Sequence, residues 1–97
     1  DWFRWYHGTV DDEKLDLIAA DAGAKLCEVV AVWAKILEKA SEGGERGTFG
    51  EINCRAIDRR LGMDDGTADR ILAAMVRERI LTSAGEVVNW SKHFSYN

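Results

Sequence analysis

Two short amphipathic segments joined by a glycine-containing turn constrain the fold of this chain more than any other feature. Asn53 is a candidate N-cap for a helix that ends near Leu61, because its side chain can accept hydrogen bonds from free backbone N–H groups. Cys54, Ile57 and Leu61 fall at helical spacing and form the expected inward face of this helix. Gly62 follows directly and predicts its end.

The second segment begins after a very short turn. Asp64 is its candidate N-cap, and its expected buried face consists of apolar residues at helical spacing: Ala68, Ile71, Leu72 and Met75. Residues 80–82 and 87–90 then read as two strands around a turn at 83–86. Two helices, a tight turn and a hairpin are the plan of a winged helix-turn-helix, whose second helix is offered to the DNA major groove. We place the helix-turn-helix at about residues 53–79 and the wing at about 80–90.

Two longer helices are expected before this motif. One starts at Asp11 or Asp12 and ends at Gly23, with an apolar face of Leu15, Ile18, Ala19 and Ala22. The other runs from about residue 25 to 41, with a broad stripe of Leu26, Val29, Val30, Trp33, Ile36, Leu37 and Ala40. Residues 2–7 and Thr48-Phe49 favour short strands. The sequence therefore predicts a single, mainly α domain with a small β-sheet over residues 1–97, and its opening on Asp1 is compatible with a domain trimmed from a longer protein.

Three stretches resemble a known family. They are the opening Asp1-Trp2-Phe3-Arg4-Trp5-Tyr6-His7-Gly8-Thr9, the stretch Val29-Val30-Ala31-Val32-Trp33-Ala34 and the closing Val88-Asn89-Trp90. Together they look like the N-terminal winged-helix domain of phage and prophage replication proteins, including replisome organisers and helicase-loader-like proteins. The resemblance covers nearly the whole chain. It implies a domain that binds origin DNA, self-associates or docks replication partners. One departure is Arg79, which stands where related winged helices commonly place glycine before the first wing strand.

The candidate DNA contacts are arginines without an acidic neighbour at helical spacing. If Ala68, Ile71, Leu72 and Met75 face inward, the opposite line of that helix is Gly66, Arg70, Ala73 and Arg77. In the preceding helix Arg59 is also without a partner, whereas Arg55 can pair with Glu51 or Asp58, and Arg60 with Asp64. We therefore predict DNA contacts at Arg59, Arg70 and Arg77, with Thr67 as the uncharged polar side chain of the first turn and with Lys92 and His93 as weaker candidates beyond the wing. The alternative is that these arginines are ordinary solvated surface.

Acidic residues crowd the start of the second helix. Asp64, Asp65 and Asp69 would repel phosphate at the end expected to meet base edges, unless they serve as cap and first-turn residues. They favour a rival function, a protein-interaction module that dimerises or docks a helicase or primase partner. The candidate partner interface is the aromatic cluster Trp2, Phe3, Trp5 and Tyr6. The same rings could instead cover the main core, or stack on unpaired bases.

Charge and composition limit the remaining functions. The net charge is −4, but residues 1–47 hold ten acidic and six basic side chains while residues 48–97 hold seven of each, so the motif half is neutral. We expect weak, salt-sensitive binding to double-stranded DNA. No metal-ligand spacing, phosphate loop or catalytic constellation is visible, so we expect no cofactor, no metal and no enzymatic activity. Cys27 and Cys54 read as core residues in a reducing compartment, and with no apolar stretch of membrane length we expect a cytoplasmic chain.

Overall fold

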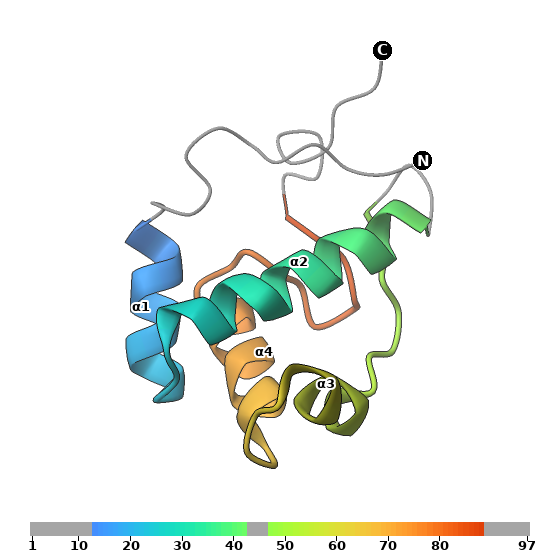
Figure 1. The fold of residues 1–97 in the computed structure, drawn as a ribbon. Coiled ribbons are helices and arrows are strands. Elements are labelled where there is room, and N and C mark those ends of the chain that lie inside the picture. The colour runs from blue at the N-terminus through green and yellow to red at the C-terminus, as the bar shows by residue number, and fades with distance from the viewer. Residues whose placement is uncertain (1–12, 43–46, 89–97) are drawn as a thin grey trace.

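Four α-helices make up most of the chain that the computed structural model describes, residues 13–42 and 47–88. They are α1 (Glu13–Ala22), α2 (Leu26–Glu42), α3 (Cys54–Leu61) and α4 (Thr67–Arg77), and Figure 1 shows α2 running across the other three. Each coincides with a helix predicted from periodicity. The expectations for residues 2–7, for Trp90 and for Lys92 and His93 fall outside the described residues.

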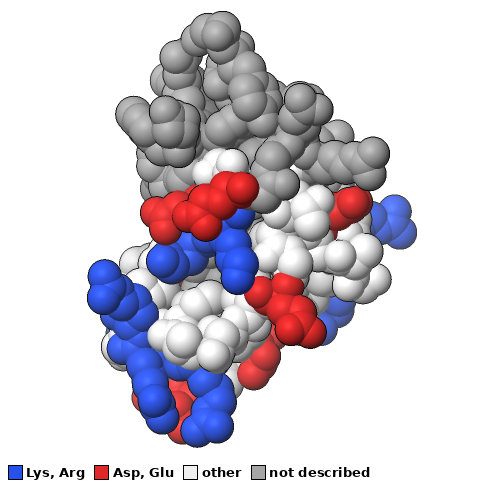
Figure 2. Space-filling view, turned by 90° about the vertical axis from the view of Figure 1, so that its right-hand side faces the viewer, with Lys and Arg blue, Asp and Glu red and all other residues white. Residues whose placement is uncertain are grey.

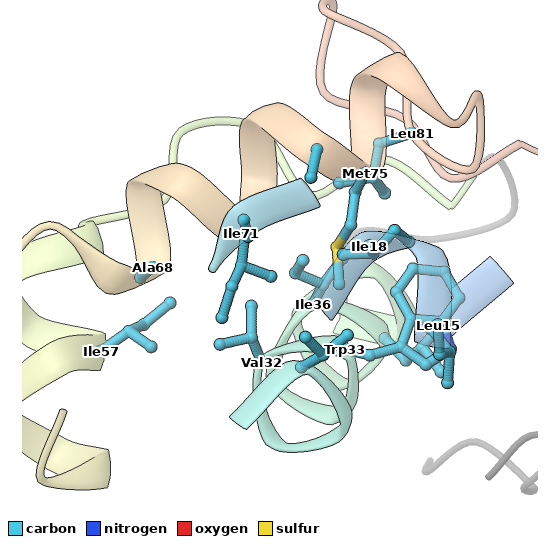
Figure 3. Close-up of a cluster of buried hydrophobic side chains, with 14 of the residues drawn as sticks. Leu15, Ile18, Val32, Trp33, Ile36, Ile57, Ala68, Ile71, Met75 and Leu81 are labelled. Carbon is cyan, nitrogen blue, oxygen red and sulfur yellow. The ribbon is translucent and has the colours of Figure 1, made fainter. Parts of the chain in front are cut away.

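The core lies where α1, α2 and α4 meet. α2 contributes Val29, Val32, Trp33, Ile36, Leu37 and Ala40, and α1 contributes Leu15, Ile18, Ala19 and Ala22. Figure 3 shows Ile71 and Met75 of α4 reaching toward Val32, Ile36 and Ile18 of these two helices. The predicted buried face of α1 is thus confirmed, and so is most of the stripe on α2, although Leu26 is exposed and Val30 is only half-buried. Burial of this apolar surface is the main favourable term in folding.

The predicted small β-sheet is not present in the described residues. Only two isolated antiparallel bridges form, Thr48 with Glu86 and Leu81 with Val87. The segment after α4 turns back on itself, and the opposite edge of its returning part bonds to the 47–49 segment: the Phe49 N–H donates to the Gly85 carbonyl and the Val87 N–H to the Gly47 carbonyl. Three short segments share so few backbone hydrogen bonds that none extends into a strand.

Three of the helices end with the same backbone motif, and one of them does so without glycine. After α1 and α3, Gly23 and Gly62 adopt φ values of +65° and +69°, as predicted for helix-ending glycines. After α4, Arg79 occupies the equivalent position with φ +64°, the only non-glycine residue with positive φ in the described chain. Its N–H donates to the Val76 carbonyl and the next N–H, of Ile80, to the Met75 carbonyl, the bond pattern of a Schellman motif. Arg79 therefore holds a conformation that favours glycine.

Candidate nucleic-acid interface

α3 presents three arginines on one exposed face. Arg55, Arg59 and Arg60 are exposed, while Ile57 and Asp58 on the other side of the helix are buried. None of the three arginines forms an ion pair within the described part of the chain. The expected partners of Arg55 and Arg60 are therefore wrong, since Glu51, Asp58 and Asp64 do not pair with them. Figure 2 shows basic side chains gathered over the lower part of one face of the molecule, with carboxylates beside them.

Capping residues in the local sequence fix both ends of α3. The Asn53 side chain accepts a hydrogen bond from the Ala56 N–H at 3.1 Å, which confirms it as the N-cap. Gly62 closes the helix, and the Met63 N–H donates to the Asp58 carbonyl at 2.8 Å. Arg59 and Arg60 lie in the last turn, where the negative end of the helix dipole stabilises their positive charge.

Asp58 joins α3 to the start of α4. Its side chain is 1% exposed. Oδ2 accepts the Gly66 N–H at 2.9 Å, and Oδ1 accepts the Ala68 N–H at 2.8 Å. The carboxylate thus satisfies two free N–H groups at the positive end of the α4 dipole. The prediction of Asp64 as the cap is wrong: the N-cap position is Gly66, and the capping side chain comes from the preceding helix.

α4 is rotated relative to its predicted orientation. Its buried residues are Thr67, Ala68, Ile71, Ala74 and Met75, and Leu72 is only half-buried. The cause is α1, which packs against α4 on the side of Ala74. The exposed line of α4 therefore centres on Asp69, Ala73 and Val76, and the predicted line through Arg70 and Arg77 lies at the border with α1.

Both arginines of α4 bond to the end of α1. Arg70 Nε donates to the carbonyl oxygen of Ala22 at 3.0 Å. Arg77 Nε forms an ion pair with Asp21 Oδ2 at 2.8 Å. Neither arginine has an acidic neighbour at helical spacing within α4, as predicted, but both have partners in the folded chain, because α1 supplies acceptors 48 and 56 positions away in the sequence.

The other predicted contact residues are dispersed. Thr67 is 3% exposed, and its hydroxyl accepts a hydrogen bond from Arg70 Nη2 at 3.4 Å, so it offers no exposed group at the start of α4. Lys92 lies outside the described residues, as does the predicted partner interface of Trp2, Phe3, Trp5 and Tyr6. Of the five predicted DNA contacts, Arg59 alone is exposed and has a side chain without a hydrogen-bond or ion-pair partner in the described part of the chain.

Arg55 and Arg60 were not predicted as DNA contacts, because Arg55 was expected to pair with Glu51 or Asp58 and Arg60 with Asp64. Yet Cys54, Ile57, Asp58 and Leu61 follow the spacing i, i+3, i+4, i+7, which defines one face of a helix. That spacing places Asp58 among the inward residues. Once this carboxylate is turned inward, α3 has no acidic side chain left on its outer face.

The two cysteines differ in environment. Cys27 is exposed, so its prediction as a core residue is wrong, and Cys54 is half-buried. Burial raises the pKa of the Cys54 thiol to about 12, helped by a hydrogen bond with the Asp69 carboxylate and by the charges of Asp69 and Asp58. A thiol in this state is a poor nucleophile at neutral pH.

Within the described ranges, no group of three His, Cys, Asp or Glu side chains is placed to hold a metal ion. No helix in the same ranges is long and apolar enough to cross a bilayer. Comparison of the chain with protein-family models, with curated proteins and with solved structures gives no significant match.

Proposed function

We propose that the chain is a non-enzymatic DNA-binding domain that contacts the phosphate backbone through the exposed arginines of α3. In this proposal α3 and α4 are the two helices of a helix-turn-helix, and residues 80–88 are a reduced wing. The observation that carries it is the outer face of α3, where Arg55, Arg59 and Arg60 stand together without an ion-pair partner among the described residues. In helix-turn-helix proteins the first helix crosses the DNA backbone, which is the role assigned to α3.

The start of α4 favours backbone contact over base reading. Base edges are normally contacted by the N-terminal residues of the second helix. Here that end carries the exposed carboxylates Asp64, Asp65 and Asp69, and Thr67 is buried. Arginines that bind phosphate fix register and orientation but carry no direct sequence information. We therefore propose binding with little sequence preference.

Arg70 and Arg77 take a secondary part in this proposal. The Asp21 carboxylate already neutralises the charge of Arg77, and Arg70 uses its Nε to hold the end of α1. With a net charge of −4 on the chain, the α3 arginines alone give weak and salt-sensitive binding. We propose that tight binding needs a second copy or a neighbouring domain. A role in phage or prophage replication initiation rests on the resemblance of the opening, α2 and closing sequences.

The test is duplex DNA binding across a salt series, measured by fluorescence anisotropy. The variant R59A/R60A removes two of the proposed phosphate contacts. The control K14A/K25A removes the same charge from exposed lysines on α1 and before α2. Each phosphate contact contributes about 0.9 to the magnitude of the slope of log binding constant against log salt concentration. R59A/R60A should therefore reduce this magnitude by about 1.8, and the control should leave it nearly unchanged. Equal effects of the two variants, or no binding by the parent at low salt, would exclude the proposal.

A further inference from the structure

A preformed hollow lies between the outer face of α4 and the turn at residues 82–85. Its volume is about 480 Å³. The apolar part of its lining comes from three separate segments: Phe49 and Ile52 before α3, Leu72 and Val76 on α4, and Leu81 after α4. Phe49 and Leu81 are buried and form the floor, whereas Val76 at the edge is 37% exposed. Apolar surface that converges in a concavity in this way is typical of a binding site.

The wall of this hollow is held by the backbone. The Phe49 N–H donates to the Gly85 carbonyl at 2.8 Å, and Thr48 forms a β-bridge with Glu86. Gly85 has φ +89°, and a Cβ atom there would lie 3.1 Å from the Gly50 carbonyl oxygen. The turn and the 47–50 segment therefore approach as closely as two glycines allow. A wall fixed before binding lowers the entropy that a partner must lose.

Among the residues that the structure describes, the charge around the hollow has one sign. The charged residues of its described lining are Glu51 and Asp69, both exposed, with no Lys or Arg beside them. Neither carboxylate forms an ion pair in the part of the chain that the structure describes. The Lys39 ammonium bonds to the backbone carbonyl of Glu51 but lines a different groove, between α2 and α3. Phosphate is disfavoured beside two such carboxylates, and a cation is favoured.

We propose that this hollow docks a short protein segment that carries aliphatic side chains and at least one Lys or Arg. The aliphatic side chains fill the floor over Phe49 and Leu81, and the cation pairs with Asp69 or Glu51 at the edge. This docking surface lies on α4 and the turn, whereas the proposed DNA surface lies on α3. The two activities thus use different residues and can be lost separately.

The experiment is selection of a random peptide library displayed on phage against the 97-residue chain, followed by affinity measurements with the enriched peptides. Two variants and two matched controls place the site. V76K puts a positive charge at the edge of the hollow, and A73K puts one on the neighbouring exposed position of α4 that does not line it. D69N removes an edge carboxylate, and D65N removes an exposed carboxylate outside the hollow.

The proposal predicts enriched peptides that combine aliphatic residues with Lys or Arg. Their affinity should fall at least about tenfold in V76K and several-fold in D69N, and should stay unchanged in A73K and D65N. Absence of enrichment, enrichment of acidic peptides, or equal binding to V76K and A73K would overturn it. So would a loss of duplex DNA binding in D69N, because the hollow would then be part of the nucleic-acid surface.

Discussion

The buried carboxylate of Asp58 gives the sharpest prediction about this fold. Replacing it by alanine removes the acceptor for the Gly66 and Ala68 N–H groups at the start of α4. A hydrogen bond to a charged group contributes about 1.5–3 kcal/mol, and the Ala68 N–H is left in a buried place. The Gly66 N–H is only part-buried and can turn to water, so the lower half of the range applies to it. We expect D58A to lower the free energy of unfolding by about 3–5 kcal/mol.

Two further substitutions at this turn sharpen the test. D58N keeps one acceptor oxygen but turns an NH₂ group toward the second N–H, so we expect a loss of about 2 kcal/mol. D64A removes the residue that sequence alone favoured as the cap. Because the Asp64 side chain is exposed and does not cap α4, its loss should cost less than about 0.5 kcal/mol.

The assay is urea unfolding followed by far-UV circular dichroism, with a thermal scan as a second measure. For a domain of this size each kcal/mol corresponds to about 4–8 °C in Tm, so D58A should melt at least about 12 °C below the parent. If D64A destabilises more than D58A, or if D58A costs less than about 1 kcal/mol, the Asp58 carboxylate is not what holds the start of α4.

Three other predictions follow from single contacts. R79G should raise the free energy of unfolding by about 0.5–1 kcal/mol in the same urea assay. Glycine relieves the left-handed conformation, which costs arginine about 1–2 kcal/mol, and this gain exceeds the cost of the added entropy of the unfolded chain, about 0.4–1 kcal/mol. No gain in stability would contradict the strain assigned to Arg79. D21N frees Arg77, so it should tighten duplex DNA binding at low salt and steepen the salt slope by up to about 0.9, and weaker binding would contradict this. Because burial raises the pKa of the Cys54 thiol to about 12, little of it is thiolate at pH 8, so Cys54 should react with iodoacetamide much more slowly than the exposed Cys27. Equal rates by mass spectrometry would refute the burial of the Cys54 thiol.

Periodicity was enough to predict the four helices and most of the core. The stripes on α1 and α2 carry many large apolar residues, so their burial can be read from spacing. The orientation of α4 could not be read in the same way. Ala74 is buried against α1, but alanine fits a buried or an exposed position equally well, so the sequence pattern pointed to Leu72 instead.

The candidate site depends on contacts between distant parts of the chain, which local spacing does not report. Arg70 and Arg77 looked unpartnered because their partners, at Ala22 and Asp21, belong to another helix. Asp58 looked like a surface ion-pair partner because the two N–H groups that donate to its carboxylate, those of Gly66 and Ala68, lie beyond the turn. Among the arginines of α3 and α4, those that are exposed and whose side chains have no partner among the described residues therefore lie on α3, whereas those of α4 are bonded to α1. In the described residues the expected wing forms only isolated bridges, because the 47–49 and 80–82 segments each share only a few backbone hydrogen bonds with residues 85–88.

The central claim is that α3, and not α4, carries the phosphate-binding charge. The most direct measurement compares the salt slope of duplex DNA binding for R59A/R60A with that for R70A/R77A, each checked for an unchanged circular dichroism spectrum. We predict that R59A/R60A reduces the magnitude of the slope by about 1.8. R70A/R77A should reduce it by less than about 0.9, since Asp21 already neutralises Arg77. A larger loss in R70A/R77A than in R59A/R60A would contradict the central claim.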